Sequence, residues 1–367
     1  MEDINDITTK LKDLKLKKQN LGQFYTTNYK YILQNLEIPK GVKTIVEPFC
    51  GNNDLLKGID TKKFKIERFD IDPKDKKTIQ KDTLLNPPCY KDKFVITNPP
   101  YLARNKSKDK KLYDLYDVND LYKCFIKELL TNQCIGGILI IPLNFWCSIR
   151  NSDIELRKSF IETYDIIHLN IFEEQVFDDT SYTICSFLFE KKKDNENKLK
   201  ITLFPSKHKI ETKLNTQNNY IIGGTIYSLG KSNKYSINRI TSKNKESANT
   251  NLLLKCIDDS EKSKIGLSFV SSEDIYIDNT PNLSSRTYAS LIIDPPIDTN
   301  TQKYLVEKFN EVLNNHRDKY SSLFLTNYRE SKEIARKRIS FDLAYSIIGF
   351  ILEKSNDNNF QIETYLQ

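Results

Sequence analysis

Short apolar segments alternate with helix-like segments over the first half of the chain, and this alternation constrains the fold more than any other feature. The segments rich in strand-forming residues are 43–49, 65–72, 93–98, 136–145, 164–172 and 182–190. Between them, the segments 118–130 and 153–162 have the apolar spacing of amphipathic helices. Strands that alternate with helices favour an α/β domain with a largely parallel sheet.

The length of 367 residues exceeds a single typical domain of roughly 100–200 residues. The segment Lys191–Lys198 consists of charged and amide residues, which favours a domain boundary. We therefore predict a first domain at 1–195 and a second at 196–367. The second part is rich in Asn, Ser and Thr, with a strand-like piece at 220–230 and helix-like segments from Thr301 onward, which favours a smaller α+β domain.

Several classes of protein do not fit the sequence. The longest apolar run, Ile135–Leu143, is too short to span a bilayer, and residues 1–18 lack the apolar core of a signal peptide. The seven cysteines form no CxxC pair, and the three histidines have no zinc-binding spacing. We therefore expect a cytoplasmic protein of a bacterial or virus-infected cell, with reduced cysteines, no membrane segment and no metal site.

The strand expected at 93–98 ends in the unusual sequence Asn98-Pro99-Pro100-Tyr101. In open α/β sheets, ligands bind beyond the carboxyl ends of the strands, where this tetrapeptide lies. Proline fixes φ and has no backbone donor, so the two prolines stiffen the turn and leave carbonyls free to accept hydrogen bonds. The asparagine adds an amide acceptor and the tyrosine a flat ring. Together they suit a planar amino group.

The alternative is that this tetrapeptide is only a turn at the end of a strand. Two other double prolines occur, in Asn86–Tyr90 and in Ile292–Asp298. The first does not follow an apolar strand and has Cys89 in place of the aromatic residue, and the second has Ile297 there. Double prolines alone are therefore weak evidence, and the motif gains weight from the residues that precede it.

Acidic residues and a glycine occur at the ends of the two preceding strands. Glu47 ends the first strand, Gly51 follows it, and a helix is expected to begin at Asn52–Asp54. Asp70 ends the next strand, where a carboxylate often binds ribose hydroxyls, and Asp82 is placed to accept from an adenine amino group. Each acidic residue alone fits an ordinary surface position. In this order they indicate a nucleotide-like cofactor, although the GxGxxG of dinucleotide sites is absent.

In this order, the segments resemble the S-adenosylmethionine-dependent DNA adenine-N6 methyltransferases of restriction-modification type. The similar segments are GQFYT at 22–26, VEPFCGNNDLL at 46–56, FDIDP at 69–73, VITNPPY at 95–101, GGILIIPLNFW at 136–146 and QVFDDTSYTICSFLFEK at 175–191. Their order is that of the gamma group of this family. The resemblance implies a Rossmann-like methyltransferase domain with a mostly parallel, about seven-stranded sheet, followed by a target-recognition domain.

The resemblance also implies S-adenosylmethionine as the cofactor. By their place in the similar segments, the residues that bind it are Gln23, Tyr25, Thr26, Glu47, Pro48, Gly51, Asp70, Asp82 and Asn98. The sequence GNND at 51–54 replaces the more common GxG spacing, so the individual contacts of this loop stay open.

The expected chemistry is methylation of an amino group at NPPY. An adenine amino nitrogen is a poor nucleophile because its lone pair is delocalised into the ring. Hydrogen bonds from its two N–H groups to Asn98 Oδ1 and the Pro99 carbonyl, in a turn stiffened by Pro100, are expected to localise that lone pair toward the methyl group. An extruded adenine also needs stacking partners, for which we assign Tyr101 and Phe177. Tyr182 is the alternative to Phe177, which fits a core position equally well.

Two basic clusters are expected to contact double-stranded DNA. Directly after NPPY, where a phosphate backbone passes an extruded base, lie Arg104, Lys106, Lys108, Lys110 and Lys111. The segment Leu325–Phe341, expected to be helical, is assigned to base recognition through Arg329, Arg336, Lys337 and Arg338. In both clusters the alternative is an ordinary solvated surface.

The predicted function is therefore site-specific methylation of adenine N6 in a short duplex sequence, as the modification part of a restriction-modification system. The alternatives are an RNA or protein-glutamine N-methyltransferase with the same NPPY chemistry, and a catalytically inactive DNA-binding relative. A nuclease fusion has little support, because the E-x-K at Glu190–Lys192 lacks a carboxylate pair. We expect a monomer or weak dimer. The sequence leaves open the target site and whether a separate restriction endonuclease acts with the protein.

Overall fold

The computed structural model describes residues 22, 24, 26–60, 62–177, 180, 182–193, 198–279, 287–330 and 335–355. The chain divides into two compact units. The first comprises Met1–Phe145 and Arg150–Lys213, and the second comprises Trp146–Ile149 and Leu214–Gln367.

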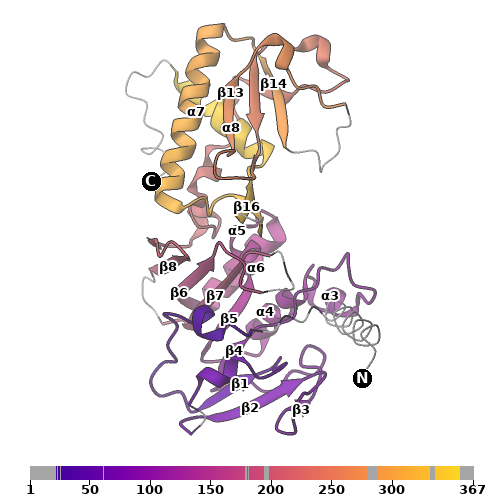
Figure 1. The fold of residues 1–367 in the computed structure, drawn as a ribbon, viewed down its shortest axis with the longest axis vertical. Helices are drawn as coiled ribbons and strands as arrows, with labels where there is room; N and C mark the ends of the chain where they lie inside the picture. Colours follow the sequence, from indigo (N-terminus) through magenta and orange to yellow (C-terminus); the bar gives the residue numbers. More distant parts are fainter. Residues whose placement is uncertain are drawn as a thin grey trace, which may run out of the picture. The chain divides into compact units, whose positions relative to one another are not determined.

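A nine-stranded sheet organises the first unit, in the order β3-β2-β1-β4-β5-β7-β6-β8-β9 (Figure 1). The strands are β1 Thr44–Glu47, β2 Lys65–Asp70, β3 Ile79–Gln80, β4 Phe94–Thr97, β5 Gly136–Pro142, β6 Tyr164–Phe172, β7 Ile184–Lys191, β8 Leu199–Phe204 and β9 Lys209–Thr212. All of them except β7 and β9 run in one direction. The predicted α/β fold with a mostly parallel sheet is confirmed, and β8 and β9 make the sheet longer than expected.

The order of the strands determines where a ligand can bind. β1 is paired with β2 on one side and with β4 on the other, with Val46 beside Glu67 and Val95. The strands that follow in sequence therefore extend outward in both directions from β1. At such a switch point, the loops after the two neighbouring strands turn away from each other and leave a crevice between them at the carboxyl edge of the sheet. The segments that follow β1, β2 and β4 thus meet at one edge of the sheet.

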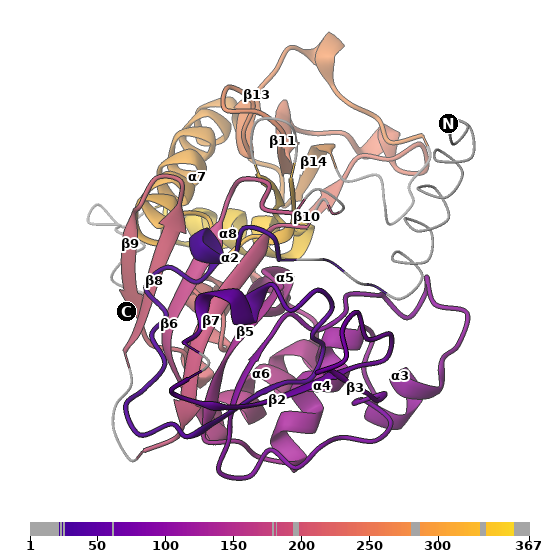
Figure 2. The same cartoon turned by 60° about the horizontal axis from the view of Figure 1, so that its bottom comes forward.

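Helices cover both faces of this sheet. The helices of the first unit and the short one at its border are α2 Tyr29–Ile32, α3 Lys111–Tyr116, α4 Leu121–Thr131, α5 Asn144–Cys147 and α6 Asn151–Thr163. Ser186 Oγ on β7 donates to the carbonyl of Ile32 in α2 at 2.6 Å. The next residue, Phe187, packs on Phe160 of α6, with ring centroids 6.1 Å apart. Successive residues of a strand point to opposite faces, so α2 and α6 lie on opposite sides of β7 (Figure 2).

Two short segments differ from the local structure expected for them. The helix expected to begin at Asn52–Asp54 is only a short 3-10 turn at Leu55–Gly58, and it follows a turn in which Asn53 has a φ of 60°. The strand expected at 220–230 is a 3-10 segment, Gly224–Leu229. Gly223 precedes it in the left-handed region, with a φ of 70°, which turns the chain out of an extended path.

The first unit extends beyond residue 195, where the sequence suggests a boundary. β8 pairs in parallel with β6, with Leu169 opposite Ile201, and β9 pairs with β8. The charged segment 191–198 therefore connects two strands of the same sheet, and the compact units divide after Lys213. Composition alone cannot separate an exposed loop from an interdomain linker, because both are solvated and polar.

The second unit consists of two antiparallel sheets and two longer helices, an α+β arrangement as predicted. The four-stranded sheet has the order β10-β14-β11-β13, and the three-stranded sheet has the order β12-β16-β15. The elements are β10 Ser236–Arg239, β11 Leu252–Lys255, β12 Ile257–Asp258, β13 Gly266–Phe269, β14 Tyr288–Asp294, α7 Thr299–Tyr320, β15 Thr326–Glu330, β16 Ala335–Arg338 and α8 Phe341–Lys354. Short 3-10 segments occur at Thr216–Asn218, Lys245–Ser247 and Ser272–Asp274.

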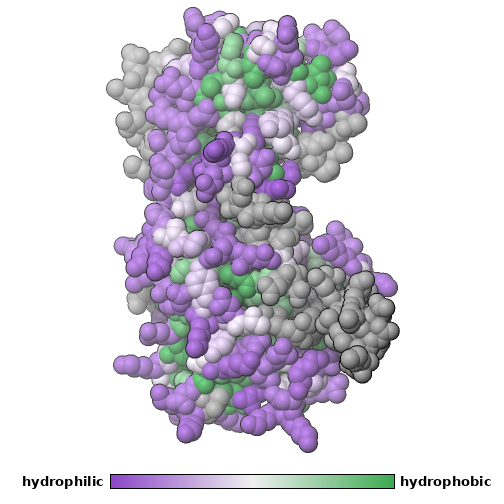
Figure 3. All heavy atoms as spheres, viewed as in Figure 1, coloured by the Kyte–Doolittle hydropathy of each residue, from purple (hydrophilic) through white to green (hydrophobic). Residues whose placement is uncertain are grey.

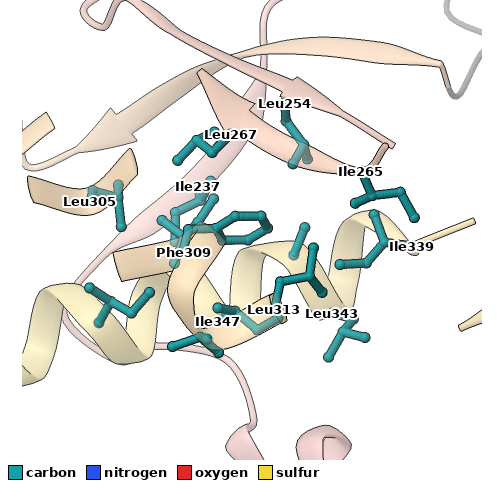
Figure 4. Close-up of a cluster of buried hydrophobic side chains, with 14 of the residues drawn as sticks. Ile237, Leu254, Ile265, Leu267, Leu305, Phe309, Leu313, Ile339, Leu343 and Ile347 are labelled. Carbon is teal, nitrogen blue, oxygen red and sulfur yellow. The ribbon is translucent and has the colours of Figure 1, made fainter. Parts of the chain in front are cut away.

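A hydrophobic core between the helices and the four-stranded sheet holds the second unit together (Figure 4). Leu305, Phe309 and Leu313 recur about every turn of α7 and are buried. On the sheet, Leu254 of β11 lies opposite Leu267 of β13, and both side chains belong to this core. α7 and α8 confirm two of the helix-like segments expected after Thr301.

The basic segment expected to form a helix at 325–341 is instead a β-hairpin. Arg329 of β15 lies opposite Arg336 of β16, and β16 also pairs with β12. Lysine and arginine favour helices locally, but pairing with a strand about 80 residues earlier in the chain overrides that preference. As a consequence, Arg336, Lys337 and Arg338 alternate between the two faces of a strand and do not share one helix face.

In the part of the chain that the structure describes, no helix combines the length and apolarity that a membrane span needs. Within the same residues, no cluster of three or more His, Cys, Asp or Glu side chains is arranged to hold a metal ion. All seven cysteines are free thiols, and only Cys89 is exposed. On the face shown in Figure 3, hydrophilic residues predominate and apolar residues gather in small patches.

Candidate active site

A cavity of about 210 Å³ opens in the first unit where β1, β2 and β4 end. Its walls include residues 49–52 after β1, 70–71 at the end of β2, 81–84 after β3, and Asn98 and Pro100 after β4. The strand ends that the sequence marks as functional thus surround one cavity. No residue of the two other double-proline segments is among the lining residues.

Asp70 fixes the loop that follows β1. Its Oδ2 accepts from the backbone N–H of Gly51 at 2.7 Å, and its Oδ1 accepts from that of Asp72 at 2.8 Å. Gly51 has a φ of 50°, which a glycine adopts without steric cost. Asp70 is 4% exposed and lines the cavity, so its carboxylate shapes the loop and also offers acceptor sites at the cavity wall.

Glu47 is a buried carboxyl group at the end of β1. Its Oε1 accepts from Thr97 Oγ1 at 2.5 Å and from the backbone N–H of Phe49 at 3.3 Å. Its Oε2 is buried without a hydrogen-bond partner in the described part of the chain. Burial raises the pKa of Glu47 to about 8, and the nearby Asp70 carboxylate adds to the rise. A buried polar atom without a partner calls for an explanation, and a polar group of a bound ligand would supply one.

The cavity wall is acidic. Against one lysine, Lys81, the lining residues include four aspartates, Asp54, Asp70, Asp82 and Asp109. Asp82 also holds its own loop, because its Oδ1 accepts from the backbone N–H groups of Leu84 at 3.0 Å and Leu85 at 3.1 Å. An excess of carboxylates favours a ligand that carries positive charge and disfavours phosphate groups.

Asn98 is held in place by the segment that precedes α2. Its Nδ2 donates to the carbonyl of Phe24 at 2.7 Å and to Thr26 Oγ1 at 3.1 Å. The Tyr101 hydroxyl donates to Asn98 Oδ1. The structure therefore brings together Thr26 and Asn98, which the sequence assigns to the same cofactor. Gln23 and Tyr25, assigned with them, lie outside the described residues.

The two rings assigned to stacking are buried. Tyr101 is 3% exposed and Phe177 is 4% exposed. The ring of Phe24 stacks on Tyr101 at a centroid distance of 5.3 Å, and it lies 6.5 Å from the ring of Phe177. The Tyr101 hydroxyl has one proton, which it shares between Asn98 Oδ1 and the carbonyl of Ile140, the latter 2.7 Å away. Pro100 lines the cavity, whereas Pro99 is buried in the turn after β4. After β1, the backbone carbonyl of Pro48 accepts from Thr83 Oγ1 at 3.0 Å.

The two basic clusters differ in their surroundings. In the first, Arg104, Lys106, Lys108 and Lys111 are exposed, and Lys110 is half-buried. In the second, Arg336 is exposed, Lys337 and Arg338 are half-buried, and Arg329 lies on the neighbouring strand. The first cluster belongs to the unit that contains the cavity, and the second cluster belongs to the other unit.

The structure adds residues that sequence reasoning missed. Phe24, in the GQFYT segment, stacks on Tyr101. In the sequence, only its aromatic side chain indicates such a contact. Ser107 and Asp109 line the cavity from within a segment that the sequence assigns only to phosphate contact. Thr97 holds the buried Glu47 carboxyl from the adjacent strand. Its place directly before NPPY gives no hint of this contact, which depends on the pairing of β1 with β4.

Comparison with known proteins gives a family for this part of the chain. Residues 3–177 match the family model described as Eco57I restriction-modification methylase. The matched residues include GQFYT, the loop after β1, Asp70, Asp82 and NPPY. No curated protein matches the chain.

Several solved structures share a distant likeness with the chain. A protein from Vibrio vulnificus described as a modification subunit of a type I restriction enzyme is 10% identical, with 54% of this chain and 50% of that chain covered and a TM-score of 0.40. The methyltransferase subunit of a type I system from Streptococcus thermophilus is 13% identical, with 48% and 45% covered and a TM-score of 0.37. The type IIG restriction endonuclease BpuSI is 12% identical, with 62% and 36% covered and a TM-score of 0.40.

The chain thus spans half of the length of the first of these structures. With such low TM-scores, the family rests on the match of residues 3–177. Residues 3–177, just under half of the chain, thus match a family of restriction-modification methylases.

Proposed function

We propose that the protein is a site-specific DNA methyltransferase that transfers the methyl group of S-adenosylmethionine to N6 of an adenine extruded from the duplex. The observation that carries the proposal is the setting of Asn98. Its Nδ2 is engaged by the Phe24 carbonyl and Thr26 Oγ1, so its Oδ1, which accepts from the Tyr101 hydroxyl, is the amide atom that can accept from an incoming amino group at the wall of an acidic cavity. The match of residues 3–177 to a restriction-modification methylase family supports DNA as the substrate.

The residues around the cavity fit S-adenosylmethionine. When bound, it supplies an activated methyl group on a positively charged sulfonium. The four aspartates at the wall suit that charge, whereas the phosphates of a dinucleotide would be repelled by them. Asp70 and Asp82 line the cavity and offer acceptors for ribose hydroxyls and for an adenine amino group. Glu47 is not among the lining residues, but its buried Oε2 has no hydrogen-bond partner in the described part of the chain.

Asn98 and Pro99 act on the target amino group under this proposal. Asn98 Oδ1 and the Pro99 carbonyl accept from its two N–H bonds, which favours a pyramidal nitrogen whose lone pair is directed at the methyl group. The bond that the Tyr101 hydroxyl makes to Oδ1 is then exchanged for one from the target. After transfer, the nitrogen is positively charged and loses one proton to water, so no strong base is needed.

The aromatic rings hold the base while it reacts. Tyr101 and Phe177 are assigned to stacking on the extruded adenine, and such contacts are worth about 1–3 kcal/mol per base. Since both rings are buried, Phe24 has to give up part of its contact with them before a base can enter. The basic residues from Arg104 to Lys111 and the second unit are assigned to DNA contact and to the choice of sequence.

Sequencing of DNA from a host that expresses the protein, with detection of N6-methyladenine, tests the proposal. We expect modification at one short sequence in cells with the wild-type protein and none in cells with Asn98→Ala. Purified protein with labelled S-adenosylmethionine is then offered duplex DNA, ribosomal RNA and a glutamine-containing release factor in parallel. If RNA or the release factor is labelled and DNA is not, DNA is the wrong substrate. The methyl-transfer chemistry assigned to NPPY would still hold.

A further inference from the structure

The segment Leu102–Lys110, named the post-NPPY loop here, has a defined conformation at the side of the cavity. The backbone N–H of Leu102 donates to Asp120 Oδ1 at 3.1 Å, and that of Arg104 donates to the Asn119 carbonyl at 2.9 Å. Within the loop, Lys110 Nζ donates to the carbonyls of Arg104 and Ser107. The segment that precedes α4 thus anchors the start of the loop, and a lysine of the loop itself fastens the rest.

The inner side of the post-NPPY loop is a wall of the cavity. Leu102, Ser107 and Asp109 are lining residues. Ser107 Oγ donates to the carbonyl of Asp109 at 2.6 Å, and Asp109 Oδ1 accepts from the backbone N–H of Lys111 at 2.9 Å. Asp109 adds one of the four carboxylates that make the wall acidic. The loop therefore contributes both shape and charge to the place assigned to the cofactor.

The outer side of the same loop is basic. Arg104, Lys106 and Lys108 are exposed. Arg104 lies 2.6 Å from Asp114, but the two side chains are 47% and 61% exposed, and such surface pairs are weak and easily exchanged. Because Lys110 is engaged inside the loop, Lys106 and Lys108 are the residues best placed to meet a phosphate backbone.

We propose that the post-NPPY loop binds the cofactor through Ser107 and Asp109 and DNA phosphates through Lys106 and Lys108, so that each ligand strengthens the binding of the other. The inference rests on the proposed function. The first ligand to bind adds contacts that hold the loop more firmly in this conformation, so the second ligand loses less conformational entropy when it binds. Such coupling is equal in both directions. We expect each ligand to tighten the other at least about fivefold.

The coupling is measured with sinefungin, an unreactive analogue of the cofactor that carries an amine in place of the sulfonium, and a short fluorescent duplex of mixed sequence. Anisotropy gives the affinity for the duplex with and without saturating sinefungin. Calorimetry gives the affinity for sinefungin with and without the duplex. The ratio of affinities in each experiment is the coupling factor, and the two ratios should agree.

Variants on the two sides of the loop separate the contacts. Lys106→Gln with Lys108→Gln should weaken the duplex several-fold and leave sinefungin affinity unchanged in the absence of DNA. Ser107→Ala with Asp109→Asn should weaken sinefungin and leave duplex affinity unchanged in its absence. Both pairs should bring the coupling factor close to one. The matched control is Lys43→Gln with Lys62→Gln, two exposed lysines at the opposite ends of the strands, which should keep the wild-type coupling factor.

The outcomes distinguish this inference from the proposed function. If the wild-type protein binds both ligands with a coupling factor of one, or if the loop variants keep the wild-type factor, the shared loop is refuted while the proposed function stands. If the wild-type protein binds no sinefungin at all, the cofactor assignment itself fails. A coupling factor above fivefold that is lost in both pairs of loop variants and kept in the control supports the inference.

Discussion

The ring of Phe24 stacks on the ring of Tyr101, with centroids 5.3 Å apart and an angle of 25° between the planes. This is the spacing of an offset-stacked aromatic pair. Tyr101 is also the ring on which the proposed function places an extruded adenine, and it is only 3% exposed. Under the proposed function, Phe24 and the base therefore compete for Tyr101.

Replacement of Phe24 by alanine tests this competition. The stacked pair is worth about 0.5–1.5 kcal/mol, and a base that enters no longer has to displace it in Phe24→Ala. We therefore predict a roughly two- to tenfold increase in the extruded population, reported by the fluorescence of 2-aminopurine at the target position. Phe24→Tyr keeps the ring and should behave like the wild type. A weaker signal in a folded Phe24→Ala protein would mean that Phe24 is a permanent wall of the base pocket.

Asn98 and Thr26 should contribute very differently to methyl transfer. Asn98→Ala removes an acceptor from the reacting amino group, so we predict a loss of roughly 100-fold or more in single-turnover transfer of labelled methyl to duplex DNA, with cofactor binding retained. Thr26→Val keeps the shape but removes one of the two contacts of Asn98 Nδ2, at 3.1 Å. The Phe24 carbonyl at 2.7 Å still holds the amide, so the loss should stay within about tenfold. A wild-type rate of methyl transfer in Asn98→Ala would mean that NPPY is only a structural turn and has no role in catalysis.

Tyr101→Phe and Tyr101→Ala separate the hydroxyl from the ring. The hydroxyl donates to the Ile140 carbonyl at 2.7 Å, so Tyr101→Phe should lower the free energy of unfolding by about 1 kcal/mol. It should keep much of the methyl transfer, because the ring remains and Asn98 Oδ1 is freed. Tyr101→Ala should lose stacking worth about 1–3 kcal/mol and slow transfer accordingly. Urea unfolding and single-turnover rates measure the two effects, and equal rates in both variants would rule out stacking on Tyr101.

The lysines after NPPY should differ in their effect on salt dependence. Lys106→Gln with Lys108→Gln should reduce the slope of log affinity for DNA against log salt by about two, since each phosphate contact contributes about one. Lys110 Nζ is engaged by two carbonyls of the loop, so Lys110→Gln should disturb the cavity wall and weaken the cofactor as well. Titrations at several salt concentrations measure the slope. An unchanged slope in the double variant would mean that Lys106 and Lys108 do not contact DNA phosphates and that the loop is only a solvated connection.

The ends of the strands could be predicted because their signals are local. Apolar runs that stop at Glu47, Asp70 and Asn98 give the strands, and the rule that ligands bind at the carboxyl edge of a parallel sheet brings these residues together without further information. The structure places the segments after β1, β2 and β4 around one cavity, as that rule requires.

The features that could not be predicted depend on contacts between distant segments. Asp109 lines the cavity because the post-NPPY loop folds back, and a run of charges does not encode this. β16 is a strand because it pairs with β12, although Arg336 and Lys337 favour a helix locally. Likewise, β8 and β9 join the sheet after a charged segment that has the composition of a linker. In each case a tertiary contact overrides the local preference.

The stability of the protein should depend on pH through Glu47. Burial raises its pKa to about 8, whereas in the unfolded chain a glutamate titrates at about 4.3. Between these values the folded state holds a proton that the unfolded state has released, so the free energy of unfolding falls as pH rises, by at most about 1.4 kcal/mol per pH unit. The fall stops above about pH 8, where both states are ionised.

Glu47→Gln removes this dependence, because a neutral amide keeps the shape and does not ionise. We predict that the variant gains stability relative to the wild type as pH rises from about 5 to about 8, measured by urea unfolding in the absence of cofactor. Glu37→Gln, at an exposed glutamate of the same unit, is the matched control and should follow the wild type. If the difference between Glu47→Gln and the wild type is the same at every pH, the carboxyl of Glu47 is already ionised in the folded protein. That result would contradict the raised pKa of Glu47.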